Sequence, residues 1–144
     1  MSEHDLKMNI LDHLAAKYAQ RIVPENLGQE DVKKREGLVT KTLGVLQENG
    51  VYACFLYLLV NEEKNKAKAE DSIICHMLSL IDELGLGIKI ARLESGAINC
   101  NAFSVLQFVS SEITSDMERL LLVREILEQM LIYVRYGAKA VRKE

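Results

Sequence analysis

The sequence VYACFLYLLV at residues 51–60 contains no charged residue and follows directly on Asn49-Gly50. Asn and Gly tolerate the left-handed backbone conformation that closes many helices, so this pair predicts a helix end. The run after it shows neither strict alternation nor a polar stripe, which is typical of a helix buried on all sides. Ten residues are about half of what a membrane-spanning helix needs. We therefore expect a short buried helix over 51–61, at the centre of a core built by longer amphipathic helices.

The chain before this run predicts two such helices. Ser2 and Asp5 resemble a capping box that opens the first helix, and Pro24 marks its end region. Its apolar residues recur at a spacing of four, at Leu6, Ile10, Leu14 and Tyr18. A second helix is expected over 30–48, and its inward residues are Leu38, Thr42, Val45 and Leu46.

The chain after the run predicts three further elements. A charged connection over 62–70 leads into a fourth helix that ends at Gly85, and its inward residues are Ile73, Ile74, Met77, Leu78 and Ile81. We expect the solvated start of this helix within the charged connection. Residues 85–101 are read as a loop or short helix, because a single strand there would have no partner. A fifth helix is expected near 102–109, and the capping box Ser115–Glu118 opens the longest one, which runs to about Arg142.

These signals predict an all-α protein, with residues 1–144 forming one compact domain of five to six helices. The net charge of −3 gives no general attraction to polyanions, so any contact with nucleic acid must come from a local basic surface. No segment resembles a signal peptide or a membrane span, and we expect a cytoplasmic protein without a membrane partner. Cys54, Cys75 and Cys100 lack metal-binding spacing and are expected to be buried, reduced thiols rather than a disulfide framework.

The sequence carries no recognisable constellation for catalysis, metal binding or a cofactor. None of His4, His13 and His76 follows a Glu at the spacing of a di-iron bundle, and no HExxH motif is present. Gly85-Leu86-Gly87 lacks the lysine of a phosphate-binding loop. We therefore expect no catalytic residue, no metal site, no cofactor and no enzymatic activity.

The basic residues predict one extended surface on the last helix and smaller groups elsewhere. Cations at a helix C-terminus also complement the helix dipole, which is the plainer explanation for some of them. Tyr133 and Tyr136 lie beside this surface, and a ring packed in the core with its hydroxyl at the surface is the expected state of Tyr133. The candidate RNA-binding residues are Lys17, Arg21, Lys34, Lys41, Arg124, Arg135, Lys139, Arg142 and Lys143.

Three segments together resemble one known family. They are Lys17-Tyr18-Ala19, then Asn49-Gly50-Val51 with the run 56–59 (LYLL), and the closing residues 133–143 with Tyr133-Val134-Arg135, Ala138-Lys139-Ala140 and Lys143. In order and spacing they are similar to the small helical subunit of type III-B (Cmr-type) CRISPR effector complexes. The resemblance extends over most of the chain.

The resemblance implies a subunit without an active site of its own. Such subunits stack with other copies of themselves into a minor filament, beside larger repeat-forming subunits that carry the guide RNA. They help to hold the guide and target RNA, whereas other subunits cleave. Two alternatives remain at this point: a helical protein–protein interaction module, such as a homodimer, without an RNA role, and a small-ligand or thiol-dependent bundle that uses Cys54, Cys75 or His76.

Overall fold

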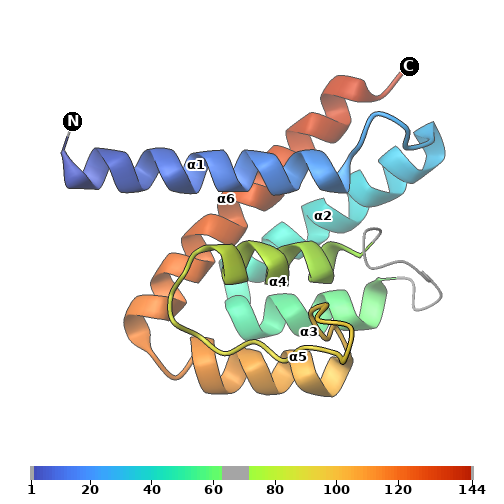
Figure 1. Cartoon of the computed structure of the whole chain (residues 1–144). Helices are drawn as coiled ribbons and strands as arrows, with labels where there is room; N and C mark the ends of the chain where they lie inside the picture. The colour runs from blue at the N-terminus through green and yellow to red at the C-terminus, as the bar shows by residue number, and fades with distance from the viewer. Residues whose placement is uncertain (1, 63–71, 144) are drawn as a thin grey trace.

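The computed structural model describes residues 2–62 and 72–143, and these residues form a bundle of helices (Figure 1). The predicted all-α class is confirmed. The expected solvated start of the fourth helix lies outside the described residues. The helices are α1 (Glu3–Ile22), α2 (Gln29–Asn49), α3 (Val51–Asn61), α4 (Ile73–Glu83), α5 (Ala102–Phe108), the π-helical turn η2 (Val109–Ile113) and α6 (Met117–Val141).

Local signals explain where most helices begin and end. The Ser2 hydroxyl accepts a hydrogen bond from the Asp5 backbone N–H at 3.1 Å, as the capping box predicts. Gly50 closes α2 with a positive φ of 95° and donates its N–H to the Leu46 carbonyl. Residues 85–101 form a loop, which agrees with one of the two expected states, and Arg92 and Ile98 make an isolated antiparallel bridge within it.

One predicted cap is wrong. Asp116, not Ser115, caps α6 and accepts a hydrogen bond from the Arg119 backbone N–H at 3.1 Å. The fifth helix ends at Phe108, close to the predicted residue 109, but an unpredicted π-helical turn, η2, follows it directly and runs to Ile113. Ser115 follows that turn, and its hydroxyl donates to the Ser111 carbonyl at 2.5 Å.

Helix α6 is the axis around which the other helices are arranged. It packs against α1 on one side and against α2 on the other (Figure 1). The α2 pairing is antiparallel, because Arg124 near the start of α6 contacts Gln47 at the end of α2, and Lys143 contacts Gln29 at its start. Helix α3 lies against α2, α4, α5 and α6, so its predicted central position is confirmed.

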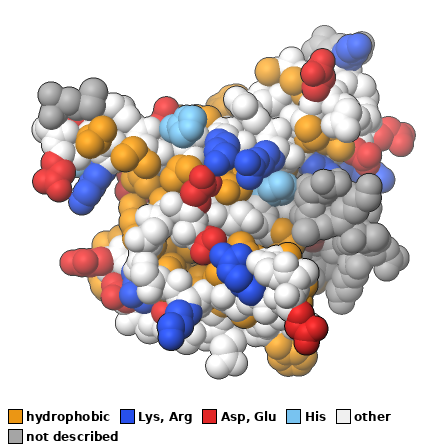
Figure 2. Space-filling model, viewed as in Figure 1, with side chains coloured by type: hydrophobic (Ala, Val, Ile, Leu, Met, Phe, Trp, Pro, Cys, Tyr) orange, Lys and Arg blue, Asp and Glu red, His pale blue; other side chains and the backbone are white. Residues whose placement is uncertain are grey.

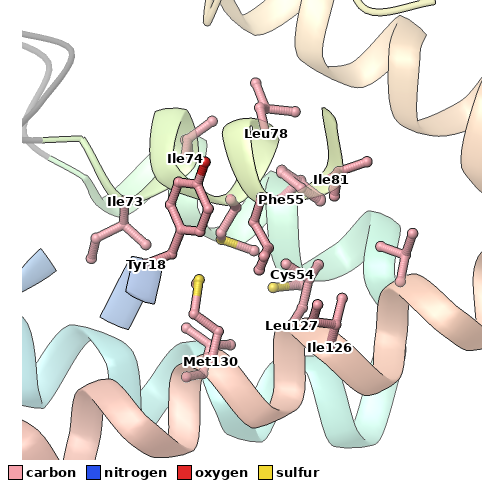
Figure 3. Packing of buried hydrophobic residues seen from close by; sticks show 14 of the residues in the cluster. Tyr18, Cys54, Phe55, Ile73, Ile74, Leu78, Ile81, Ile126, Leu127 and Met130 are labelled. Carbon is pink, nitrogen blue, oxygen red and sulfur yellow. The ribbon is translucent and has the colours of Figure 1, made fainter. Parts of the chain in front are cut away.

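The buried residues form one hydrophobic cluster to which every helix contributes. Cys54, Phe55 and Leu58 of α3 are fully inaccessible to solvent and belong to this cluster together with residues of α1, α4 and α6. Figure 3 shows members of the cluster from all four helices, among them Tyr18 of α1 and Met130 of α6. All five residues predicted to line the inner side of α4 are buried.

Two predictions of burial are wrong in part. The outer side of α3 is accessible, with Tyr52 40%, Leu56 43% and Val60 69% exposed. Apolar patterning cannot show which sides of a helix its neighbours cover, and folded proteins tolerate apolar atoms at the surface. In α1, Leu14 and Tyr18 are buried, whereas Leu6 and Ile10 are each more than half exposed. The first turns of α1 extend past the rest of the bundle, so no helix covers them (Figure 1).

The expectation of three reduced thiols is also wrong. Cys75 and Cys100 form a disulfide with a Cα–Cα distance of 5.8 Å, a normal separation for this bond, and Cys54 is the buried free thiol. With three cysteines at least one must stay unpaired within the chain, but the other two can still form a disulfide. The two partners stand 25 residues apart, and only the path of the 84–100 loop brings them together. Within the described part of the chain, no helix is both long and apolar enough to cross a membrane.

Candidate nucleic-acid interface

Arg124 and Arg135 of α6, and Arg142 directly after its last residue, recur at helical spacing, and Arg124 and Arg142 contact α2. Arg124, Arg135 and Arg142 are eleven and seven residues apart, and at about 100° per residue they fall within roughly 20° of each other around the helix axis. We call them the seam arginines. Arg124 donates from Nη2 to the Gln47 carbonyl at 3.0 Å, where α2 ends, so this cation satisfies a carbonyl of the last helical turn.

Arg142 is engaged in an ion pair with a buried carboxylate. Its Nη1 lies 2.6 Å from Oε2 of Glu36, a residue of α2 that is only 8% exposed. A charge-assisted hydrogen bond of this kind offsets part of the desolvation cost of the Glu36 carboxylate. Beside it, Gln29 accepts a hydrogen bond from the Lys143 backbone N–H at 2.7 Å. These contacts hold the end of α6 against the start of α2. The Arg142 side chain is therefore already used in an ion pair within the protein.

The outer surface at the end of α6 exposes two cations and an aromatic ring. Lys139 and Lys143 are exposed, and the Lys139 Nζ lies 5.8 Å from the ring centroid of Tyr136, whose exposed fraction is 62%. We call Tyr136, Lys139 and Lys143 the C-terminal patch. Arg135 is half-buried at the edge of this patch, and its Nε is buried without a hydrogen-bond partner among the described residues.

Tyr133 behaves differently from Tyr136 although the two lie close together in the sequence. Its ring packs against the core, and its hydroxyl donates to Asp12 of α1 and accepts from Gln129 at 2.7 Å. The hydrogen bond to Asp12 is the main reason that the pKa of Tyr133 is raised. The expectation of a packed ring with an outward hydroxyl is confirmed for this residue. The sequence prediction did not identify Tyr136 as the exposed ring. Its position on the polar side of α6 was the signal for that exposure.

A second basic group, Lys17 and Arg21, lies near the end of α1, and the carboxylate of Glu83 lies next to it. Glu83 of α4 accepts from the Lys17 Nζ at 2.8 Å and from the Tyr18 hydroxyl at 2.6 Å, and the Arg21 guanidinium lies 4.8 Å from the Tyr18 ring centroid. The hydrogen bonds from Lys17 and Tyr18 hold the pKa of Glu83 below its usual value. Burial, assisted by the bond to Glu83, raises the pKa of Tyr18 to about 12. The positive charge available to an anion is therefore reduced here.

The two lysines predicted on α2 point away from the seam with α6. Counted around the helix, Lys34 lies about 200° from Glu36 and Lys41 about 140° from it, and both are exposed. Lys33, three residues before Glu36, falls on the seam side and was overlooked; the spacing from Glu36 could have identified it. The nine predicted cations thus form four groups on the fold: the seam arginines, the two lysines of the C-terminal patch, the pair on α1 and the pair on α2. On the side that Figure 2 shows, cations and carboxylates alternate rather than forming one continuous basic area.

Two further features bear on what the fold can do chemically. Burial raises the pKa of the Cys54 thiol to about 12, which keeps it protonated and unreactive at neutral pH. Among residues 2–62 and 72–143, no group of three or more His, Cys, Asp or Glu side chains is placed to hold a metal ion. Comparisons of the chain with family models, with curated proteins and with solved structures found no match.

Proposed function

We propose that this protein is a non-catalytic small subunit of an RNA-guided effector complex of the type III-B kind, in which it helps to hold guide and target RNA. The resemblance in three ordered segments supports this proposal. The structural observation that carries it is the C-terminal patch, where an exposed lysine lies over an exposed tyrosine ring. Lysines bind phosphates without regard to sequence, and exposed aromatic rings can stack on bases. The proposed partners are larger repeat-forming subunits, further copies of this chain and RNA, in the cytoplasm.

The RNA contact should be electrostatic and weak in the isolated protein. The overall charge of −3 repels RNA from most of the surface, so several copies must line up on one strand for useful affinity. For single-stranded RNA, the logarithm of the binding constant should fall by about 0.7 per phosphate contact for each tenfold rise in salt. Two contacts from each copy, made by Lys139 and Lys143, would give a slope of about −1.4 by the same relation.

The decisive experiment compares two charge-reversed variants in the assembled complex. The double variant Lys139→Glu with Lys143→Glu removes the cations of the C-terminal patch. Arg135 and Arg142 are left unsubstituted, because both are half-buried and their loss would also affect packing. Lys7→Glu with Lys89→Glu makes the same charge change at exposed positions far from the end of α6 and serves as the control. We expect the first variant to assemble but to lose RNA association and salt dependence, and the control to keep both. Equal RNA binding by the two variants would reject the proposed RNA role of the patch.

A specific observation favours a second candidate function, that of a protein–protein interaction module. The exposed apolar residues Leu6, Met8 and Ile10 lie on the first turns of α1, and Tyr52, Leu56 and Val60 lie on α3. Large exposed apolar side chains on two helices are a feature that protein contacts can use, because such contacts bury apolar surface. If neither the isolated chain nor its assembly binds RNA at low salt, while sedimentation shows a stable homodimer, this second function replaces the first.

A further inference from the structure

The Cys75–Cys100 disulfide joins a helix to the far end of the following loop. Cys75 lies in the first turn of α4, where its backbone N–H is capped by the Ser72 hydroxyl at 3.2 Å. Cys100 stands immediately before Asn101, the N-cap of α5. The bond therefore encloses the whole of the 84–99 loop and fixes where α5 begins. We call residues 84–100 the latched segment.

Both cysteines are half-buried and line an open pocket of about 460 Å³. Four charged side chains line the same pocket, with Lys17 and Arg92 as cations and Asp82 and Glu83 as carboxylates. Two ion pairs cross this pocket, Lys17–Glu83 at 2.8 Å and Arg92–Asp82 at 2.7 Å, and all four side chains remain about a third exposed or more. A small molecule that carries both charges can therefore reach the disulfide and exchange partners with these pairs.

We propose that Cys75 and Cys100 form a reversible thiol–disulfide exchange site for a small zwitterionic thiol of the glutathione class. The open pocket supplies access, and its mixed charges match the carboxylates and the ammonium group of such a thiol. Cys54 lies outside this chemistry, because it is fully buried and its thiol stays protonated. The inference does not depend on the proposed RNA role of the C-terminal patch, because it uses the two cysteines and another ligand; Lys17 is the one residue that is both a candidate RNA contact and part of this pocket.

The exchange needs two molecules of the small thiol. The thiolate of the first attacks one sulfur of the Cys75–Cys100 bond, forms a mixed disulfide with that cysteine and releases the other as a thiolate, which takes a proton from water. The second thiol attacks the mixed disulfide and releases the remaining cysteine. The protein disulfide is thereby reduced to two thiols while two small thiols are oxidised to one small disulfide. The same steps in reverse, with the small disulfide as oxidant, close the bond again.

The consequence of reduction is a looser latched segment on an intact bundle. Within the segment, Asn99 donates its backbone N–H to Ala91 at 2.8 Å and Arg92 donates to the Gly96 carbonyl at 3.0 Å, so its hairpin-like turn holds itself together. Beyond the backbone hydrogen bonds that Leu84 and Gly85 make to the end of α4, its side-chain ion pair with α4 is Arg92–Asp82, which is exposed and contributes little in water. Without the disulfide, the segment is held mainly by the half-buried side chains of Ile88, Ile90 and Ile98.

The first test counts thiols in the folded protein. The native protein is equilibrated in buffers of reduced and oxidised glutathione, quenched in acid, and labelled with a maleimide under denaturing conditions for mass spectrometry. We expect one thiol in the oxidised buffers and three in the reduced ones, with a two-thiol change and no unfolding by circular dichroism. Labelling before denaturation should modify Cys75 and Cys100 after reduction and spare Cys54. Reduction only in denaturant would make the bond a static cross-link, and thiols that never oxidise would also overturn the proposal.

The second test asks whether the bond acts as a latch. Hydrogen exchange of the latched segment should be at least tenfold faster in the reduced protein than in the oxidised one, while exchange at the centre of α6 stays unchanged. The melting temperature should fall by about 5–15 °C on reduction, because the open loop regains conformational freedom in the unfolded chain. Cys75→Ser with Cys100→Ser should show the reduced behaviour in every buffer, and Cys54→Ala should keep the response. Equal exchange of the latched segment in the two redox states would overturn its control by the disulfide.

Discussion

Glu36 is a carboxylate with 8% of its surface exposed, and Arg142 supplies its charge partner from beyond the end of α6. Removal of this cation leaves a desolvated negative charge, so Arg142→Ala should lower the free energy of unfolding by about 1–3 kcal/mol. Lys143→Ala is the matched control, because the contact made by Lys143 uses its backbone N–H and survives the substitution. Urea denaturation measures both values. Equal stability of the two variants would show that water solvates Glu36 in place of Arg142.

The Lys17–Glu83 pair predicts a pH dependence of stability. The pKa of Glu83 lies below its ordinary value of 4.5 in the folded protein, because Lys17 and Tyr18 donate hydrogen bonds to it. Its contribution to stability is therefore complete above pH 4.5 and is lost as the pH falls through the lower folded-state pKa. Lys17→Met should lower the melting temperature at pH 7 and much less at pH 3, whereas Lys7→Met should show no such difference. If Lys17→Met lowers the melting temperature by the same amount at both pH values, the effect of Lys17 comes from the packing of its methylene groups instead.

At the scale of one element, helix α3 has a buried and an exposed side. The same Leu→Ala substitution on each side compares their contributions to the free energy of unfolding. Leu58 is fully buried, while Leu56, two residues earlier, is 43% exposed. Leu58→Ala should lower the free energy of unfolding by about 2–5 kcal/mol, through lost burial and the cavity left behind. Leu56→Ala should cost less than about 1 kcal/mol, as expected at a partly exposed position. Chemical denaturation of both variants gives the comparison, and similar losses would mean that the outer side of α3 is covered in solution.

The elements also show what the sequence could and could not predict. Helices α2, α3 and α6 begin and end within a few residues of the sequence prediction, and α4 ends within a few residues of it, because glycines, caps and apolar spacing act locally. The continuation of α5 into η2 was missed, since residues 109–113 carry no local signal that separates a π turn from a helix end. The Cys75–Cys100 bond was missed because it depends on the path of a loop. Leu6 and Leu56 were expected inside because patterning shows that a side is apolar, not that another element covers it.

The candidate RNA site was predictable as a set of residues but not as a surface. Helical spacing predicts that Arg124, Arg135, Lys139, Arg142 and Lys143 share one side of the last helix. It could not show that Arg124 contacts α2 or that Arg142 pairs with Glu36, because both contacts join residues far apart in the chain. The position of Tyr136 on the polar side of α6 indicated an exposed ring, but the sequence did not show that the Lys139 ammonium lies beside it. Which cations face outward is thus a property of tertiary packing.

At the scale of the whole molecule, stability is concentrated around α3 and the middle of α6 and declines toward the start of α1. Every described residue from Ser2 to Ile10 is exposed, whereas seven residues of α6 are buried. Local opening is easiest where few apolar contacts hold a segment, so the amides at 3–10 should exchange within seconds and those at 123–134 far more slowly. Hydrogen exchange with mass spectrometry at low protein concentration measures this gradient.

The same gradient predicts the effect of a truncation. Removal of residues 1–8 deletes no buried side chain of the described chain and leaves Leu14, Tyr18 and the Lys17–Glu83 pair in place. The free energy of unfolding should therefore change by less than about 1 kcal/mol, as for exposed positions in general. A control truncation that also removes Leu11 and Leu14 takes away core contacts and should cost several times more. If removal of residues 1–8 alone destabilises the protein, and more so at high than at low protein concentration, then Leu6, Met8 and Ile10 are covered by a second copy. That result would favour the interaction module over the RNA-binding subunit.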